Sequence, residues 1–67
     1  MFENLKAEMS RKNITIMDLS KDKELGLSYE TLRNKFSGKT EWTRREIWIL
    51  KNKYFQNKSI EYLFEQK

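Results

Sequence analysis

Residues 15–38 read TIMDLSKDKELGLSYETLRNKFSG, and this stretch predicts two short helices joined by a glycine-bearing turn. Thr15 and Asp18 form a capping-box pattern, in which the hydroxyl accepts from a first-turn N–H and the carboxylate lies at the positive helix end. Gly26 is free to adopt the positive φ that follows a helix. Ser28 is an N-cap for the next helix. The stretch therefore predicts a helix after Thr15 and another after Ser28.

Apolar residues at helical spacing predict three further helices, over about residues 2–12, from residue 43 onward and over about 59–65. Thr43 and Glu46 form a second capping box. Trp42, just before it, is placed to pack on the first turn against Ile47. The apolar positions are Phe2, Leu5 and Met9, then Ile47, Leu50 and Tyr54, then Ile60, Leu63 and Phe64. We expect an all-α fold, one domain over residues 1–67 built as a compact bundle of about five short helices.

The composition excludes several kinds of functional site. The chain has 67 residues with no cysteine, histidine or proline, which removes disulfides, zinc sites, thiol nucleophiles and imidazole bases. We therefore expect no enzyme, no cofactor and no small-molecule ligand. No apolar run approaches the ~18 residues of a membrane span, and the first residues lack the pattern of a signal peptide. These features predict a cytoplasmic protein with no membrane partner.

Positive charge is concentrated in one segment. The formal net charge is +4, but residues 1–32 carry −1 and residues 54–67 are neutral, so residues 33–53 carry +5. The basic residues of that segment are Arg33, Lys35, Lys39, Arg44, Arg45, Lys51 and Lys53. A local basic surface is expected of a protein that binds a polyanion. The alternative is a solvated, lysine-rich helix face.

From Thr15 to Thr43 the chain resembles the phage repressor and Cro type of helix-turn-helix proteins, often called the XRE family. The residues that carry the resemblance are Thr15, Leu19, Ser20, Leu25-Gly26-Leu27-Ser28, Thr31-Leu32 and Asn34 through Thr43. It implies a lambda-repressor-like DNA-binding domain with its helix-turn-helix at about 15–37. It also implies a small, Cro-like transcriptional repressor of a phage or mobile element, which binds double-stranded DNA sequence-specifically in the bacterial cytoplasm, associated with the nucleoid. The alternative is a protein-interaction module on the same fold, either antitoxin-like or an anti-repressor.

One departure from the family is an insertion. Five residues, 21–25, separate Ser20 from Gly26, where the family has three. Two extra residues in a regular helix would rotate the next part of the chain by about 200° and turn Leu25 away from the core. We therefore expect a longer turn that keeps Leu25 inward.

In this family the second helix of the motif enters the DNA major groove. The resemblance then implies that bases are read by Ser28, Tyr29, Glu30, Arg33 and Asn34. Arginine pairs with guanine O6 and N7, asparagine with adenine N6 and N7, and glutamate accepts from a cytosine amine. Glu30 also repels phosphates, so the sign of its contribution stays open. Other interpretations also remain open: Tyr29 as half-buried packing, and Asn34 as either the cap of its own helix or a simply solvated side chain.

The same docking geometry implies phosphate contacts on both sides of that helix. The residues are Thr15 and Ile16 through their backbone N–H groups, with Lys35, Lys39, Thr40, Arg44 and Arg45 on the other side. For Lys35, the methylene stem is expected to cover the core while the ammonium reaches solvent.

The chain has more aromatic surface than a domain of this size buries. Trp48, Phe55 and Tyr62 lie off the predicted apolar faces, and with Phe64 they form the expected interface of a homodimer. A two-fold dimer would place two DNA-reading helices about 34–36 Å apart, as a palindromic operator requires. The alternative is that these rings close a monomeric core.

Overall fold

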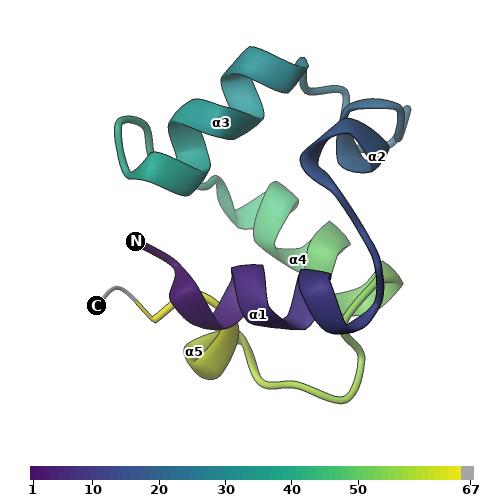
Figure 1. Ribbon diagram of the computed structural model, residues 1–67, viewed down its shortest axis with the longest axis vertical. Coiled ribbons are helices and arrows are strands. Elements are labelled where there is room, and N and C mark those ends of the chain that lie inside the picture. The colour runs from purple at the N-terminus through teal and green to yellow at the C-terminus, as the bar shows by residue number, and fades with distance from the viewer. Residues whose placement is uncertain (66–67) are drawn as a thin grey trace.

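The computed structural model describes residues 1–65, which form five helices and no strand. The helices are α1 (Glu3–Arg11), α2 (Ile16–Ser20), α3 (Tyr29–Ser37), α4 (Arg44–Lys53) and α5 (Ile60–Leu63). In Figure 1, α2 and α3 lie at one end of the molecule, α1 and α5 lie at the other, and α4 runs between the two pairs. The predicted all-α fold is confirmed.

Local capping accounts for where the helices begin. Thr15 accepts from the N–H of Asp18 at 3.1 Å, and Asp18 in turn accepts from the N–H of Thr15 at 2.9 Å. Thr43 and Glu46 make the same reciprocal pair at the start of α4, at 3.2 and 2.9 Å. The hydroxyl of Ser28 accepts from the N–H of Thr31 at 3.2 Å and starts α3. Both predicted capping boxes and the Ser28 cap are confirmed.

Residues with positive φ reverse the chain after two of the helices. Asn13 (φ 58°) follows α1, and asparagine tolerates this conformation better than most residues. Gly38 (φ 88°) is the C-cap of α3. Gly26 also has a positive φ of 64°, but it does not follow α2 directly as predicted, because α2 already ends at Ser20. Gly26 instead closes the inserted turn, where its N–H donates to the carbonyl of Asp22 at 3.1 Å.

A single apolar core joins the helices and the inserted turn. Its fully buried members include Leu5, Leu19, Leu32, Leu50 and Leu63, one from each helix. Leu25, inside the inserted turn, is 1 % exposed. The expectation of a longer turn that keeps Leu25 inward is therefore confirmed.

An aromatic cluster closes the end of the core beside α5. The ring of Trp42 lies edge-on to those of Phe36, Phe64 and Phe2, with centroid distances of 5.1, 5.6 and 6.3 Å. Trp42 and Ile47 line the same hollow of about 180 Å³. Because these phenylalanines come from α3, from the end of α5 and from the residue before α1, the cluster fixes the two ends of the described chain against α3.

Candidate nucleic-acid interface

Helix α3 has one apolar face that is buried and one polar face that is exposed. Leu32 and Phe36 point into the core, at 0 and 3 % exposure. Glu30 and Arg33 are exposed, and Asn34 is half-buried. Figure 1 shows α3 along one edge of the molecule, with the helices other than α2 on one side of it. The polar face of α3 is thus open to a large partner.

Four of the predicted nucleic-acid contacts meet in one polar hollow of about 330 Å³. It is lined by Glu30, Arg33, Asn34, Ser37 and Lys39. Glu30 and Arg33 lie one helical turn apart, yet no ion pair joins them among residues 1–65. The Asn34 carbonyl accepts from the N–H groups of Lys39 and Thr40 at 2.9 and 3.4 Å, so the helix end is capped without its side-chain amide. The base-reading donors and acceptors of Glu30, Arg33 and Asn34 are therefore unengaged within the described chain.

The two remaining base-reading candidates differ in their availability. The hydroxyl of Ser28 accepts from the Thr31 N–H and donates to Thr31 Oγ1 at 2.9 Å, so both of its functions are already used at the start of α3. Tyr29 is 42 % exposed, and its phenol makes no hydrogen bond to any residue that the structure describes. Its exposure places the ring on the surface rather than in half-buried packing.

The cations of residues 33–53 divide into two groups. Lys35, Arg45, Lys51 and Lys53 each contact a protein acceptor. Lys51, for example, donates to the carbonyl of Gln56 at 2.6 Å. Within the described chain, Arg33, Lys39 and Arg44 have no such partner. The positive charge left for an external anion is therefore concentrated around the C-terminal end of α3 and the start of α4.

Lys35 does not lie where a phosphate could reach it, and this corrects the prediction from the sequence. Its Nζ lies 2.9 Å from Oε1 of Glu46 and donates to the carbonyl of Glu41 at 2.9 Å. It also lies 5.8 Å from the centre of the Trp42 ring. The side chain is 8 % exposed, so the ammonium turns inward instead of reaching solvent.

Glu46 is the carboxylate that pairs with the buried ammonium of Lys35. Burial alone would raise the pKa of this carboxyl, but the Thr43 N–H and the Lys35 ammonium together hold it below its ordinary value. The carboxylate is therefore charged, caps α4 and pairs with Lys35 at the same time. This pair ties α3 to the start of α4.

The start of α2 offers less to a phosphate than predicted. The N–H of Thr15 already donates to the Asp18 carboxylate, and this bond lowers the pKa of Asp18. The negative charge of Asp18 therefore occupies the place expected for the anion. The N–H of Ile16 is among the first-turn donors that have no acceptor within their own helix, while its side chain lines an apolar hollow beside Met9 and Phe36.

Arg45 and Thr40 complete the predicted phosphate contacts. Both side chains are exposed. The guanidinium of Arg45 donates to the carbonyl of Glu24 in the inserted turn, whereas the Thr40 hydroxyl has no partner among residues 1–65. Arg45 is thus partly engaged, while its neighbour Arg44 contacts no acceptor in the same part of the chain.

Three of the four predicted dimer residues are held within the monomer. Phe55 is 1 % exposed, which corrects the expectation that its ring lies at the surface. The chain turns back after α4 and inserts this ring into the core. The hydroxyl of Tyr62 donates to Glu8 Oε2 at 2.9 Å, and Phe64 is half-buried in the aromatic cluster. Of the four, Trp48 on α4 is the one that lies open, at 49 % exposure.

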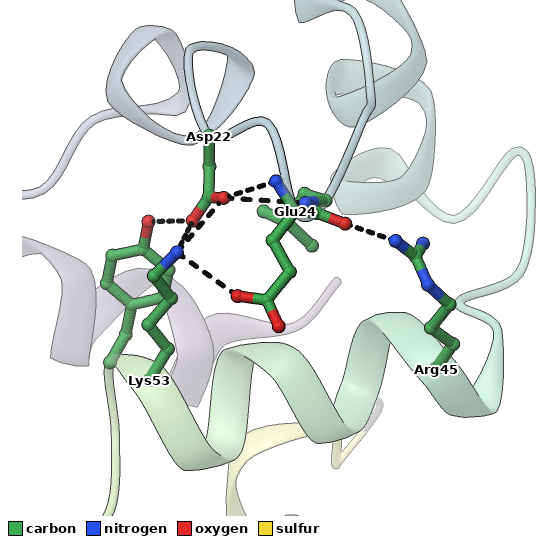
Figure 2. A network of polar contacts seen from close by, with 6 residues as sticks. Asp22, Glu24, Arg45 and Lys53 are labelled. Atoms are coloured by element: carbon green, nitrogen blue, oxygen red, sulfur yellow. Dashed lines mark hydrogen bonds and ion pairs between the residues drawn. The ribbon is translucent and has the colours of Figure 1, made fainter.

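A polar network on the inserted turn was not predicted. Figure 2 shows Asp22 and Glu24 of the turn facing Lys53 and Arg45 of α4. The Asp22 carboxylate, 4 % exposed, accepts from the hydroxyl of Tyr54 and lies 3.0 Å from Lys53 Nζ. The hydrogen bond from Tyr54, followed by that from Lys53, lowers the pKa of Asp22 to about 2. Burial and the bond to Asp22 raise the pKa of Tyr54 to about 12.

No local signal in the sequence could have found this network, because Asp22 and Tyr54 lie 32 positions apart. The one pointer was the expectation of a longer turn at residues 21–25, four of which are charged.

No family model, curated protein or solved structure matched this chain. Across residues 1–65, no helix is long and apolar enough to cross a membrane. The same residues hold no group of three or more carboxylates placed to bind a metal ion.

Proposed function

We propose that this protein binds double-stranded DNA sequence-specifically through α3 and acts as a small, Cro-like repressor of a phage or mobile element. In this proposal α2 and α3 are the two helices of a helix-turn-helix, and α3 lies in the major groove. Such a protein would act in the bacterial cytoplasm, on DNA of the nucleoid.

The observation that carries the proposal is the set of unengaged polar groups on one face of α3. Glu30, Arg33 and Asn34 share a hollow with Lys39, and none of these side chains bonds to another described residue. Their chemistry covers what base edges require: arginine donates to guanine, asparagine pairs with adenine, and glutamate accepts from cytosine. A lysine-rich face that was merely solvated would not need this combination of an acceptor, an amide and cations.

The pairing of the other cations with acceptors in the protein supports the same placement of α3 on DNA. Four of the seven basic side chains in residues 33–53 contact protein acceptors, which leaves Arg33, Lys39 and Arg44 for phosphates or bases. We assign Lys39, Thr40 and Arg44 to phosphates on one side of α3, with Arg45 reaching the backbone only if it leaves Glu24. Lys35 and the Thr15 N–H are excluded from this role by their protein partners.

A homodimer on a palindromic operator is part of the proposal, with Trp48 as its anchor. Trp48 lines a hollow of about 320 Å³ with Ile49, Asn52, Lys53 and Glu24. This patch carries both charge signs around an exposed ring, so it is able to face a copy of itself across a two-fold axis.

The same exposed tryptophan favours the second candidate, a protein-interaction module of antitoxin-like or anti-repressor type. In that case the Trp48 surface would bind another protein, and DNA binding would be weak or absent. Tryptophan is enriched among the residues that dominate protein–protein binding energy.

Salt dependence of binding to a random-sequence duplex separates the two candidates. DNA binding predicts that log K falls linearly with log salt, by about 0.9 for each phosphate contact. Lys39→Gln should flatten this slope by about one unit. Lys58→Gln is the control of equal charge, because Lys58 lies between α4 and α5, away from α3, where its Nζ is 3.9 Å from Glu8 Oε2. Absent or salt-insensitive binding, or equal effects of the two variants, would reject the proposed interface.

Sequence specificity is tested separately by selecting duplexes from a random library at fixed salt. Enrichment of a common half-site, repeated with two-fold symmetry, is the expected result. If the enriched pool showed no common sequence, the protein would be a non-specific DNA binder and the repressor assignment would fail.

A further inference from the structure

The inserted turn, residues 21–25, is bonded to α4 at two separated places. At the C-terminal end of α4, the Asp22 carboxylate meets Tyr54 and Lys53. Nearer the N-terminal end, Arg45 donates to the carbonyl of Glu24. Figure 2 shows these two attachments far apart along the helix. Arg45 and Lys53 lie eight positions apart, which corresponds to about 12 Å of helix.

The attachment through Asp22 is the stronger of the two. Besides Tyr54 and Lys53, Asp22 accepts from the N–H groups of Glu24 and Leu25 at 2.9 and 3.4 Å, so one buried carboxylate organises the turn and joins it to α4. The nearby ion pair of Lys53 with Glu24 has side chains 46 and 60 % exposed and contributes little. Hydrogen bonds to a buried, charged acceptor contribute more than those at the surface.

This attachment acts directly on α3. The turn ends at Leu25, and α3 begins at Tyr29, so only three residues lie between the anchored segment and the helix. The buried side chain of Leu25 holds the turn in the core, while the Asp22 carboxylate holds it against α4. The buried pair of Lys35 and Glu46 holds the other end of α3 to the start of α4. Removing the Asp22 attachment would leave the N-terminal end of α3 held only through Leu25, Arg45 and its packing on α2, while its C-terminal end keeps the Lys35–Glu46 pair.

We propose that Asp22 and Tyr54 are positioning residues, which set the angle of α3 against DNA and so decide which bases Arg33 and Asn34 reach. This inference rests on the proposed function. Hydrogen bonds to base edges weaken steeply when distance or direction is wrong. Long, flexible lysine side chains tolerate a change of helix angle, because they contact phosphates as point charges. The attachment should therefore affect base discrimination more than overall DNA affinity.

The chain supplies a matched pair of variants for the test. Tyr54→Phe removes one phenol–carboxylate hydrogen bond at the turn, and Tyr62→Phe removes one at the contact of α5 with Glu8 on α1. Both tyrosines are half-buried, so the two variants delete the same chemical group from similar surroundings. Asp22→Ala removes the whole Asp22 attachment and keeps the bond of Arg45 to the Glu24 carbonyl. All are compared with the unmodified chain at a temperature where each is fully folded by circular dichroism.

The measured quantity is the ratio of affinity for the selected duplex to affinity for a random duplex at one salt concentration. Asp22→Ala should lower this ratio at least about tenfold, which corresponds to ~1.4 kcal/mol. Tyr54→Phe should lower it in the same direction, while Tyr62→Phe leaves it unchanged. The salt slope on random DNA should be the same in all four proteins, because the change in helix angle removes no phosphate contact. Equal ratios for Tyr54→Phe and Tyr62→Phe would overturn the proposal, since a purely structural role lowers both affinities together.

A measurement without DNA keeps this inference separate from the proposed function. Amide residual dipolar couplings should show α3 rotated relative to α4 in Asp22→Ala and unchanged in Tyr62→Phe. If the unmodified chain binds no DNA but α3 rotates, the proposed function fails while the anchoring role stands. If α3 keeps its orientation in Asp22→Ala, the positioning role is wrong, whatever the DNA binding.

Discussion

Lys35 on α3 and Glu46 on α4 form a buried ion pair, with Nζ 2.9 Å from Oε1 and each side chain 8 % exposed. The carboxylate also accepts from the N–H of Thr43, and the ammonium donates to the carbonyl of Glu41. Each charge is therefore solvated by the protein, and each would be left without compensation if its partner were removed.

Lys35→Met should destabilise the fold by about 3–5 kcal/mol, because it leaves the Glu46 charge buried and unpaired. The double variant Lys35→Met with Glu46→Gln should recover much of this loss, since glutamine is neutral and still able to accept from the Thr43 N–H. Urea denaturation measures both. A single variant as stable as the unmodified chain would show that the ammonium contributes no pairing energy.

Acid should unfold the protein partly through Asp22. Its pKa falls from the ordinary 3.8 to about 2 in the folded state, so its stabilisation is present above the unfolded value and lost as pH drops through the folded value. The shift corresponds to about 2 kcal/mol at neutral pH. Stability measured between about pH 5 and pH 2 should therefore fall less steeply for Asp22→Asn than for the unmodified chain. Parallel curves would contradict the buried, charged carboxylate.

Arg33→Ala and Lys39→Ala should weaken DNA binding in different ways. Loss of Arg33 should cost about 1–3 kcal/mol at one base position and relax the preference there. Loss of Lys39 should weaken all sequences about equally and reduce the salt slope by about one unit. Competition among single-base variants of the selected duplex distinguishes the two effects. Identical profiles would mean that the hollow on α3 binds phosphates only.

Phe55→Ala should lower folding stability, whereas Trp48→Ala should abolish dimerisation. Phe55 is buried, so its truncation should cost about 3–5 kcal/mol of folding stability. Trp48 is 49 % exposed, so its truncation should change stability by less than about 1 kcal/mol. Sedimentation equilibrium of the unmodified chain should show dimers at high concentration that Trp48→Ala abolishes. A monomer at every concentration, with and without DNA, would remove dimerisation from the proposal.

The features that the sequence predicted are those determined within one helical turn. The Thr15 and Thr43 capping boxes and the Ser28 cap each involve residues three positions apart, so the pattern of residue types contains the whole interaction. The inward position of Leu25 could be predicted equally well, because it depends only on the geometry of an inserted turn.

The features that the sequence could not predict depend on long-range partners. Lys35 is a basic residue of the kind that binds phosphate, but its ammonium pairs with Glu46, which lies eleven positions further along the chain. Phe55 lay off the helical face of its neighbours because it comes after α4 and enters the core from a loop. Asp22 and Tyr54 meet only after α4 is packed. Periodicity describes one helix at a time and contains no information on these pairings.

The contact between α1 and α5 has a consequence for the order of assembly during synthesis. Asn4 donates to the carbonyl of Tyr62, 58 residues away, at 2.9 Å, and Phe2 packs edge-on against Phe64. Until the ribosome has released the segment that carries α5, the first helix lacks these partners and the aromatic cluster is incomplete. The aromatic cluster therefore closes only after α5 has left the ribosome, and until then Phe2 in the nascent chain lacks Phe64 as its packing partner.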